Sequence, residues 1–238
     1  MPSANQIGIE NQLREHANGH GADLHSLLRE FRDSHVSHLT SFHGRGKVLF
    51  AEGEPARGIY LLLSGRASLS ISSSEGRIVI LRLAQAGDVL GLNSVLRNAS
   101  YEATVKTLEP CRTDFISRAE LLELMQRRES AAQAVLKILS QELTELTERA
   151  RVLLLPQTVN AKLARLLLDW SKTPDGERSS TDRIDRLFTQ EEIAQMICTT
   201  RETVTRLLAA LSRREVIHIN SGSILIRDRG ALEAIALV

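Results

Sequence analysis

The stretch from Thr189 to Leu211 constrains the fold most, because it carries the signals of two short helices joined by a tight turn. Thr189 is a favoured N-cap residue, and Glu192 three positions later completes a capping box. Thr199 and Thr200 are candidate caps for a second helix. Apolar residues then recur at helical spacing, at Val204, Leu207, Leu208 and Leu211. The pattern predicts a helix-turn-helix, which inserts its second helix into the major groove of DNA.

The segment Cys198–Arg206 closely resembles the recognition element of the cyclic AMP receptor / fumarate-nitrate regulator (CRP/FNR) family. Upstream, Gly53–Gly65 resembles the β-roll signature of that family, and Ala86–Gly91 resembles the strand that leads into its effector cassette. The two matches stand in the family's order and spacing, and the resemblance covers roughly residues 30–238. It implies an α+β fold with an N-terminal β-roll or jelly roll of the cyclic-nucleotide-binding type, a long dimerisation helix and a C-terminal winged helix-turn-helix.

The sequence patterns along the chain predict four segments. Residues 1–28 are a polar extension, 29–117 are the β-roll sensor, 118–156 are a dimerisation helix with a hinge at Pro156, and 157–238 are the DNA-binding domain. Short β-rich runs between turn signals favour a jelly roll. These runs are Val48–Phe50, Ile59–Leu63, Ala67–Ile71, Arg77–Leu83, Ala103–Thr107 and Arg112–Ile116, with a hairpin tip at Ser72–Gly76. Further on, a helix is expected at Val159–Trp170, a loop at Lys172–Thr181, and a hairpin wing from strands Val216–Ile219 and Ser223–Ile226.

One continuous helix is expected from Arg118 to about Leu155. Within it, apolar residues alternate at spacings of four and three, as in a coiled-coil seam. The predicted dimer seam consists of Leu136, Leu139, Leu143, Leu146, Ala150 and Leu153, preceded by Ala132. The alternative is a helix packed only on its own β-domain, for which Val135 and Ile138 would supply the buried face. The strict 3.5-residue period favours the dimer.

Composition is that of an ordinary protein with 42% hydrophobic and 25% charged residues. No apolar run is long enough for a membrane span, and no signal peptide is evident. The two cysteines, Cys111 and Cys198, indicate a cytoplasmic protein with reduced thiols, and Cys198 is interpreted as a small buried filler. Residues 157–238 hold 12 Lys/Arg and 11 Asp/Glu, so specificity has to come from placed side chains rather than from general attraction to phosphate.

The predicted base contacts are Arg201, Glu202, Thr205 and Arg206, and the predicted phosphate contacts are Thr199, Thr200 and Thr203. Arginine pairs bidentately with guanine, and glutamate accepts from cytosine N4. In the family, the cyclic AMP receptor branch carries the Arg, Glu and later Arg found here at 201, 202 and 206. The resemblance therefore implies a half-site like TGTGA rather than TTGAT. Double-stranded DNA and a second copy of the chain are the implied partners, with RNA polymerase a further one if the protein activates.

The resemblance also indicates a diverged effector pocket, made of Gly91, Leu92, Tyr101, Glu102, Thr147 and Glu148. Where cyclic-AMP-binding members carry Gly-Glu and Arg-Ser, this chain has Gly91-Leu92 and Tyr101-Glu102. Leu92 accepts nothing from a ribose hydroxyl, and Glu102 would repel a cyclic phosphate. Cyclic AMP is therefore not expected to be the effector.

No resident cofactor is expected. Two cysteines are too few for a four-cysteine iron–sulfur cluster. A haem or metal sensor remains an alternative, because six of the seven histidines precede the β-roll core: His16, His20, His25, His35, His38 and His43. Solvated histidines in a polar segment explain them more simply. No base, nucleophile or metal-ligand constellation points to a jelly-roll enzyme.

Overall fold

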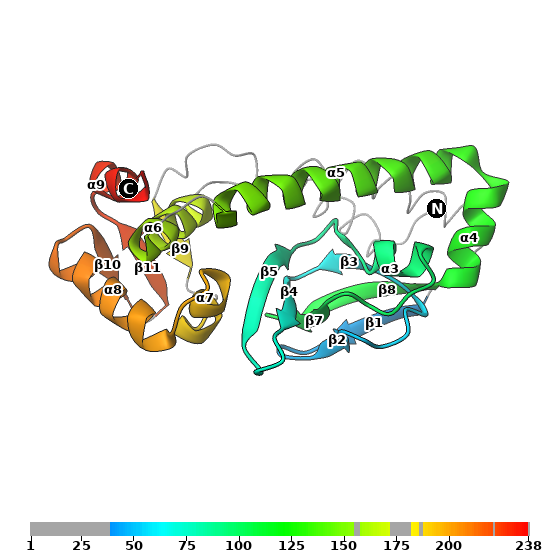
Figure 1. The fold of residues 1–238 in the computed structure, drawn as a ribbon, viewed down its shortest axis with the longest axis horizontal. Helices are drawn as coiled ribbons and strands as arrows, with labels where there is room; N and C mark the ends of the chain where they lie inside the picture. The colour runs from blue at the N-terminus through cyan, green and yellow to red at the C-terminus, as the bar shows by residue number, and fades with distance from the viewer. Residues whose placement is uncertain (1–38, 155–157, 172–181, 186–187, 221, 238) are drawn as a thin grey trace, which may run out of the picture. The chain divides into compact units, whose positions relative to one another are not determined.

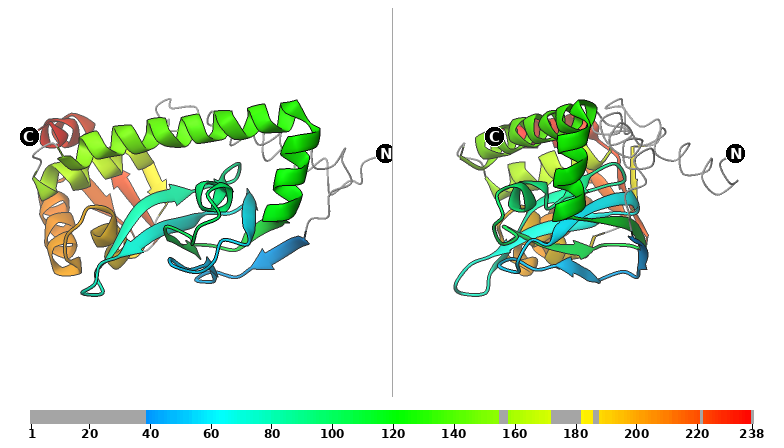
Figure 2. Two further views of the ribbon diagram at one scale, coloured as in Figure 1. Left: turned by 45° about the vertical axis from the view of Figure 1, so that its right-hand side comes forward. Right: turned by 90° about the vertical axis from the view of Figure 1, so that its right-hand side faces the viewer.

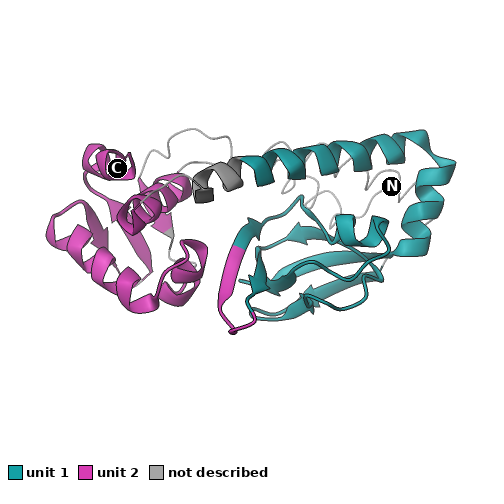
Figure 3. Ribbon diagram, in the orientation of Figure 1, with its two compact units in different colours: residues 1–73, 81–152 teal, residues 74–80, 153–238 magenta. Residues whose placement is uncertain are grey.

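The computed structural model describes residues 39–154, 158–171, 182–185, 188–220 and 222–237, with the side chains of 148–154 and 185 left out. Two compact units divide the chain (Figure 3). One comprises residues 1–73 and 81–152, and the other comprises residues 74–80 and 153–238. The Lys172–Thr181 loop, the Pro156 hinge and the N-terminal extension lie outside the described residues.

Two four-stranded sheets, with strand orders β1-β8-β3-β6 and β2-β7-β4-β5, make up the β-rich part of unit 1, and only the start of β5 is assigned to the other unit (Figures 1 and 3). The first sheet is formed by β1 (Leu39–His43), β8 (Cys111–Ser117), β3 (Gly58–Ser64) and β6 (Val89–Leu90). The second is formed by β2 (Val48–Phe50), β7 (Thr104–Thr107), β4 (Ala67–Ser72) and β5 (Ile78–Ala84). The pairings given for both sheets are antiparallel. All six predicted strands are confirmed, and the β4–β5 connection holds the predicted hairpin tip. Strand β6 lies within the Ala86–Gly91 segment that the family resemblance indicated as a strand, whereas β1 was not predicted.

The prediction of one continuous helix from Arg118 to Leu155 is wrong. Helix α4 (Arg118–Arg127) ends at Arg128, which has an extended backbone (φ −134°, ψ 111°), and α5 (Glu129–Leu154) starts in a new direction (Figure 1). A capping box between Ser117 and Glu120 fixes the start of α4. Helix α5 lies alongside the β-roll (Figure 2). Helix α4 buries Leu121 and Leu124, whereas α5 buries a different set of side chains. The bend lets both helices bury their apolar faces in one core.

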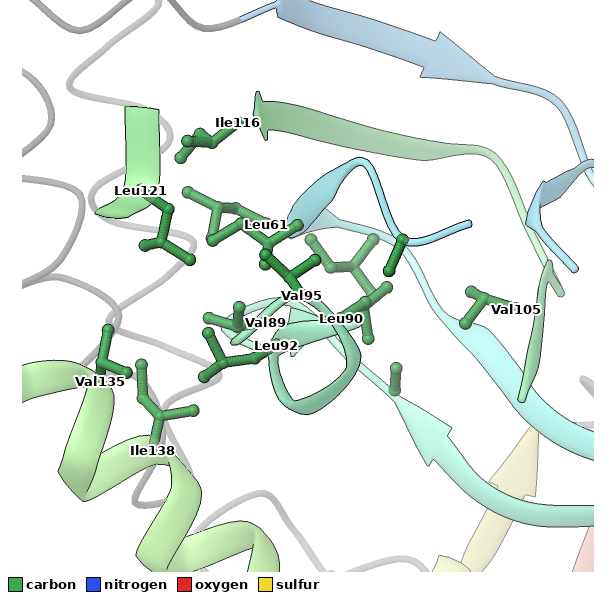
Figure 4. Packing of buried hydrophobic residues seen from close by; sticks show 14 of the residues in the cluster. Leu61, Val89, Leu90, Leu92, Val95, Val105, Ile116, Leu121, Val135 and Ile138 are labelled. Carbon is green, nitrogen blue, oxygen red and sulfur yellow. The ribbon is translucent and has the colours of Figure 1, made fainter. Parts of the chain in front are cut away.

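Helix α5 has two apolar faces. Val135 and Ile138 point into the core of unit 1, among Val89, Leu90 and Leu92 (Figure 4). In contrast, the seam residues Leu136, Leu143 and Leu146 are 64%, 66% and 56% exposed. The two interpretations of this helix are therefore compatible, because intrachain packing covers one face and part of Leu139 but leaves Leu136, Leu143 and Leu146 of the predicted seam exposed.

Unit 2 is built on α6 (Val159–Trp170), α7 (Gln190–Met196), α8 (Arg201–Arg213) and α9 (Arg229–Ala236). A three-stranded antiparallel sheet of order β10-β11-β9 completes it, from Ile217–Ile219, Ser223–Ile226 and Arg183–Asp185. The predicted α6, helix-turn-helix and hairpin wing are confirmed, whereas β9 and α9 were not predicted. The core of this unit includes Leu163, Leu167, Val204, Leu208 and Leu232. Trp170 stacks on Phe188 with ring centroids 4.6 Å apart.

Candidate functional site

The helix-turn-helix is fixed by local hydrogen bonds that the sequence specifies. Thr189 and Glu192 form the predicted capping box at the start of α7. Thr200 is the N-cap of α8, and its hydroxyl accepts from the backbone N–H of Thr203 at 3.3 Å. Because each cap satisfies an N–H that would otherwise lack a partner, both helices have defined first turns.

The outer face of α8 carries the predicted base-contacting residues. Val204, Leu208 and Leu211 are buried, which leaves the first two turns to present their polar residues outward. The exposed residues are Arg201, Glu202, Thr205 and Arg206. This end of α8 therefore offers two guanidinium groups and one carboxylate to a molecule that approaches it.

Two of these residues have interactions that define their positions. The hydroxyl of Thr205 lies 2.6 Å from Oε1 of Gln190, so a hydrogen bond joins the first residue of α7 to α8. The pKa of Glu202 lies below its usual range, because its own backbone N–H and the Thr200 hydroxyl bond to the carboxylate. Glu202 is therefore a charged acceptor at neutral pH.

The predicted phosphate contacts lie at the start of the same helix. Thr199 and Thr203 are half-buried and Thr200 is exposed. The Thr200 and Thr203 hydroxyls lie 3.1 Å apart.

The interpretation of Cys198 as a buried filler is wrong. Its side chain is exposed, and its backbone is left-handed with φ 56°. The residue follows Ile197, where α7 ends, and the next N–H, that of Thr199, bonds to the Ala194 carbonyl at 2.9 Å. A left-handed residue at this position turns the chain toward α8. Cys111, in contrast, is buried, and burial raises the pKa of its thiol.

A second candidate site is a cavity of about 450 Å³ in unit 1, between the β-roll and α5. We call it the β-roll pocket. It is lined by Phe50, Leu69, Leu81, Arg82, Gly91, Leu92, Asn93, Ser94, Tyr101, Glu102, Ala103, Leu139, Glu142, Leu143, Glu145 and Leu146. Four of the predicted effector residues, Gly91, Leu92, Tyr101 and Glu102, therefore line one cavity.

The α5 wall of the β-roll pocket differs from the predicted one. Its residues are Leu139, Glu142, Leu143, Glu145 and Leu146. Thr147 is not among the lining residues; it is exposed, and its hydroxyl donates to the Leu143 carbonyl. The side chain of Glu148 lies outside the described residues.

Tyr101, the residue before Glu102, has both its hydroxyl and its ring engaged in contacts with the core of unit 1. The hydroxyl of Tyr101 donates to the Gly58 carbonyl at 2.6 Å, and its ring stacks on Phe50 with centroids 3.8 Å apart. Burial raises the pKa of Tyr101 to about 12. Gly91 has a left-handed backbone (φ 81°), and a Cβ there would lie 2.6 Å from the Tyr101 ring, so only glycine fits.

Charged groups of the β-roll pocket are tied into ion pairs. Arg82 on β5 is mostly buried, with Nη1 2.7 Å from Oδ2 of Asp88 and Nη2 3.5 Å from Oε1 of Glu142. Arg82 therefore links the β-roll to α5.

On the other side of the pocket, Glu102 accepts from Arg97 at 2.6 Å and from the amide of Asn93 at 2.9 Å. Arg82, Glu102 and Glu142 therefore each have a near counter-charge or hydrogen-bond donor.

Sequence reasoning missed Phe50, Arg82 and Glu142 as pocket residues. Arg82 had a signal, because it is a single charged residue in an otherwise apolar strand run from Ile78 to Ala84. Such a residue in a half-buried strand needs a partner of opposite charge. Phe50 and Glu142 carried no sequence signal of a pocket, because an aromatic residue in a strand and a glutamate on a helix are both common.

Of the six histidines that suggested a haem or metal sensor, only His43 lies within the described residues. Its Nε2 is 2.9 Å from the Thr113 hydroxyl, and burial lowers its pKa. Among the residues that the structure describes, no three His, Cys, Asp or Glu side chains gather as a metal site would need. None of the described helices is long and apolar enough to cross a membrane.

Family models match both units of the chain. A cyclic nucleotide-binding domain matches residues 42–128, and a Crp-like helix-turn-helix domain matches residues 161–235. Among curated proteins, the chain is 27% identical to a CRP-like cAMP-activated global transcriptional regulator of Mycobacterium tuberculosis, over 77% of this chain and 82% of that one. It is 29% identical to the anaerobic regulatory protein of Bacillus subtilis, over 89% and 87%.

Solved structures agree on the fold. FixK2 from Bradyrhizobium japonicum superposes with a TM-score of 0.70 at 20% identity, over 84% of this chain and 98% of that one. A CRP-family transcriptional regulator from Thermus thermophilus gives a TM-score of 0.69 at 23% identity, over 83% and 97%.

Proposed function

Because the chain belongs to the CRP/FNR family of transcription regulators, we propose that it acts as a homodimer, reads a TGTGA-like palindrome and does not respond to cyclic AMP. The observation that carries the proposal is the exposed row Arg201, Glu202 and Arg206 at the start of α8. Sensing is assigned to residues 29–117, dimerisation to 118–156 and DNA binding to 157–238. The family consists of regulators rather than enzymes.

Base recognition rests on the chemistry of that row. Arg201 and Arg206 each offer a fork of donors that matches O6 and N7 of guanine, and Glu202 accepts from N4 of cytosine. Thr205 contributes a hydroxyl that Gln190 already orients. Thr199, Thr200 and Thr203 flank the helix start, where hydroxyls and backbone N–H groups suit phosphate oxygens. In the dimer, two such helices would enter major grooves about 34 Å apart.

Dimerisation is supported by the uncovered face of α5. Leu136, Leu143 and Leu146 are all more than half exposed in a single chain, although they keep the coiled-coil spacing. Leucines at these three positions lie along one side of the helix, and together they form an apolar stripe that another copy of α5 would cover. Ala150 and Leu153 extend the same spacing beyond the described side chains.

The wall of the β-roll pocket supports independence from cyclic AMP. Leu92 is buried and offers no acceptor to a ribose. Tyr101 is bonded to Gly58, so it brings no positive charge to a phosphate. Arg82 is already held by Asp88 and Glu142. A cyclic phosphate would therefore lose its hydration without gaining a free counter-charge.

The alternative is a haem- or metal-binding sensor with the same DNA output. It depends on the six histidines that precede the β-roll core, of which His43 is described and the other five lie outside the described residues. An absorbance spectrum of the purified protein tests it, because bound haem absorbs strongly near 400 nm. The proposal further includes action in the cytoplasm, with RNA polymerase as a partner if the regulator is an activator.

Selection of binding sites from random DNA, with and without cyclic AMP, tests the main proposal. We expect the same TGTGA-like palindrome in both conditions. Arg201→Val should lose the preference at the outer guanine, at a cost of about 1–3 kcal/mol, while the positions read by Glu202 and Arg206 persist. As a matched control, Arg213→Val removes an exposed arginine from the far end of α8 and should leave the selected site unchanged. An unchanged site for Arg201→Val, or selection only with cyclic AMP, contradicts the proposal.

A further inference from the structure

A hydrogen bond between the two helices of the helix-turn-helix fixes a glutamine side chain beside the outer face of α8. Gln190 is the first residue of α7, and Thr205 lies in the second turn of α8. The Thr205 hydroxyl is 2.6 Å from Oε1 of Gln190. Thr205 is exposed and Gln190 is half-buried, so the bonded pair lies at the surface of unit 2. The residue after Thr205 is Arg206, one of the proposed base contacts.

The single proton of the Thr205 hydroxyl is used inside the protein. Oε1 of Gln190 lies 2.6 Å from this hydroxyl, and the Arg201 carbonyl oxygen lies 2.9 Å from it. Both of these oxygens are acceptors, so the proton that each bond requires comes from Thr205. Toward a third molecule, the Thr205 oxygen and Oε1 of Gln190 can therefore only accept hydrogen bonds. We call these two atoms the oxygen end of the pair.

The other branch of the Gln190 amide only donates. Because Oε1 meets the Thr205 hydroxyl, the NH2 group is left for other contacts, and it carries two donors and no acceptor. Among the described residues no group accepts a hydrogen bond from this NH2 group, and its nitrogen is not one of the buried atoms that lack a partner. The pair therefore presents a donor beside acceptors at the surface.

A donor beside an acceptor matches the major-groove edge of one base. Adenine presents an acceptor at N7 and a donor at N6, which is the pattern that a glutamine amide recognises. Guanine presents two acceptors, cytosine one donor, and thymine one acceptor. Each of these three bases would leave one end of the pair without a partner, and an unpaired polar group at a desolvated contact is unfavourable. The pair is therefore complementary to adenine.

We propose that Gln190 and Thr205 act as one unit that recognises an adenine, with the Gln190 NH2 group donating to N7 and the oxygen end accepting from N6. The inference rests on the proposed function, because it takes the exposed face of α8 to enter the major groove. It adds a base-contacting residue from α7. The adenine is the last base of TGTGA, because that base adjoins the inner guanine assigned to Arg206, and Thr205 adjoins Arg206 on α8.

Selection of binding sites from random DNA by the full chain and by single variants tests this unit. Gln190→Glu keeps an acceptor for the Thr205 hydroxyl but has no donor for N7, and Thr205→Val removes the hydroxyl at nearly constant shape. We expect the unaltered protein to prefer adenine at the last position about ten-fold over any other base. Both variants should reduce this preference to about three-fold or less. Thr205→Ser keeps a hydroxyl and should keep the preference.

Gln195→Glu is the matched control. It makes the same substitution on α7 at a position about 140° around the helix from Gln190. We expect this variant to select the same bases, with the same ratios, as the unaltered protein. Loss of the adenine preference in Gln195→Glu would show that a negative charge on α7 is enough to alter selection, and it would overturn the assignment to Gln190.

Affinities for the palindrome and for its adenine-to-guanine variant show whether the two residues act together. Gln190→Ala and Thr205→Val should each lower the ratio of the two affinities. The double variant should lower it little further, because either substitution already breaks the unit. Losses that multiply in the double variant refute the unit. If Gln190→Ala weakens binding to both DNA sequences by the same factor, Gln190 contacts a phosphate and the base assignment is wrong.

The result for the unaltered protein separates this inference from the proposed function. If the unaltered protein selects no TGTGA-like palindrome, the proposed function is wrong and the adenine unit falls with it. If it selects the palindrome, and the Gln190 and Thr205 variants select the same bases with the same ratios, the regulator stands and the adenine unit is wrong. A thermal melt of each variant shows that the fold is kept.

Discussion

Replacing Leu143 by glutamate tests whether the uncovered face of α5 is a dimer interface. Leu143 is 66% exposed in the single chain, so two-thirds of its side chain remains available for burial against a second copy. Burying a whole leucine side chain contributes roughly 1.5–3 kcal/mol. Burying the exposed two-thirds of Leu143 on dimerisation should therefore contribute about 1–2 kcal/mol per copy. For the two copies that a two-fold axis brings together, the contribution to the free energy of dimerisation is about 2–4 kcal/mol.

The substituted carboxylate adds a further cost to dimerisation, because it would be removed from water close to its own symmetry mate. We therefore expect Leu143→Glu to raise the dimer dissociation constant by at least thirty-fold, which corresponds to about 2 kcal/mol. The fold of unit 1 should be unaffected, because a surface position normally tolerates such a change to within about 0.5 kcal/mol. Sedimentation velocity over a concentration series measures the dissociation constant, and a thermal melt checks the fold.

Thr144→Glu is the matched control. It introduces the same charge one residue further along α5, at an exposed position off the apolar stripe. We expect this variant to dimerise like the unaltered protein. A dissociation constant for Leu143→Glu within three-fold of the unaltered value would show that the stripe is not the interface. Equal weakening by both variants would show that charge on α5, rather than burial of Leu143, controls assembly.

Three further predictions concern substitutions at single positions. Gly91→Ala should destabilise unit 1 by about 1–3 kcal/mol in a denaturant titration, because its Cβ meets the Tyr101 ring at 2.6 Å and its φ is positive. Tyr101→Phe leaves the Gly58 carbonyl without its donor and should cost about 1–3 kcal/mol in the same assay. Thr200→Val removes a hydroxyl bonded to the Glu202 carboxylate, so the pKa of Glu202, followed by carbon NMR, should rise toward its usual range. Since the folded pKa is depressed, the stabilising effect of that charge is present above the usual carboxyl range and is lost as the pH falls through the folded pKa.

The sequence predicted those parts of the structure whose signals are local. The capping box at Thr189 and Glu192, and the period of Val204, Leu208 and Leu211, need only a dozen residues to be recognised. The strands of the β-roll were found for the same reason, because turn residues bound each of them.

Features set by tertiary packing were missed. The break at Arg128 lies in a run with no glycine or proline, and it follows from the need of α4 and α5 to bury different faces in one core. Strand β9 has only three residues, and its pairing with β11 carries no local signal. The pair of Arg82 with Glu142 joins residues 60 positions apart, so neither position indicates the other in the sequence.

Two leucines of α5 belong both to the pocket wall and to the proposed dimer stripe, and this has a thermodynamic consequence for the proposed regulator. Leu143 and Leu146 line the β-roll pocket and are also more than half exposed on α5. A ligand in the pocket and a second copy of the chain would both contact these side chains, so each changes the free energy with which the other binds. Linkage makes the two changes equal: if the ligand strengthens dimerisation ten-fold, the dimer binds the ligand ten-fold more tightly than the monomer does. The affinity of a ligand for the β-roll pocket should then depend on protein concentration near the dimer dissociation constant, and this dependence should disappear in Leu136→Glu, because Leu136 is exposed on α5 and is absent from the pocket wall.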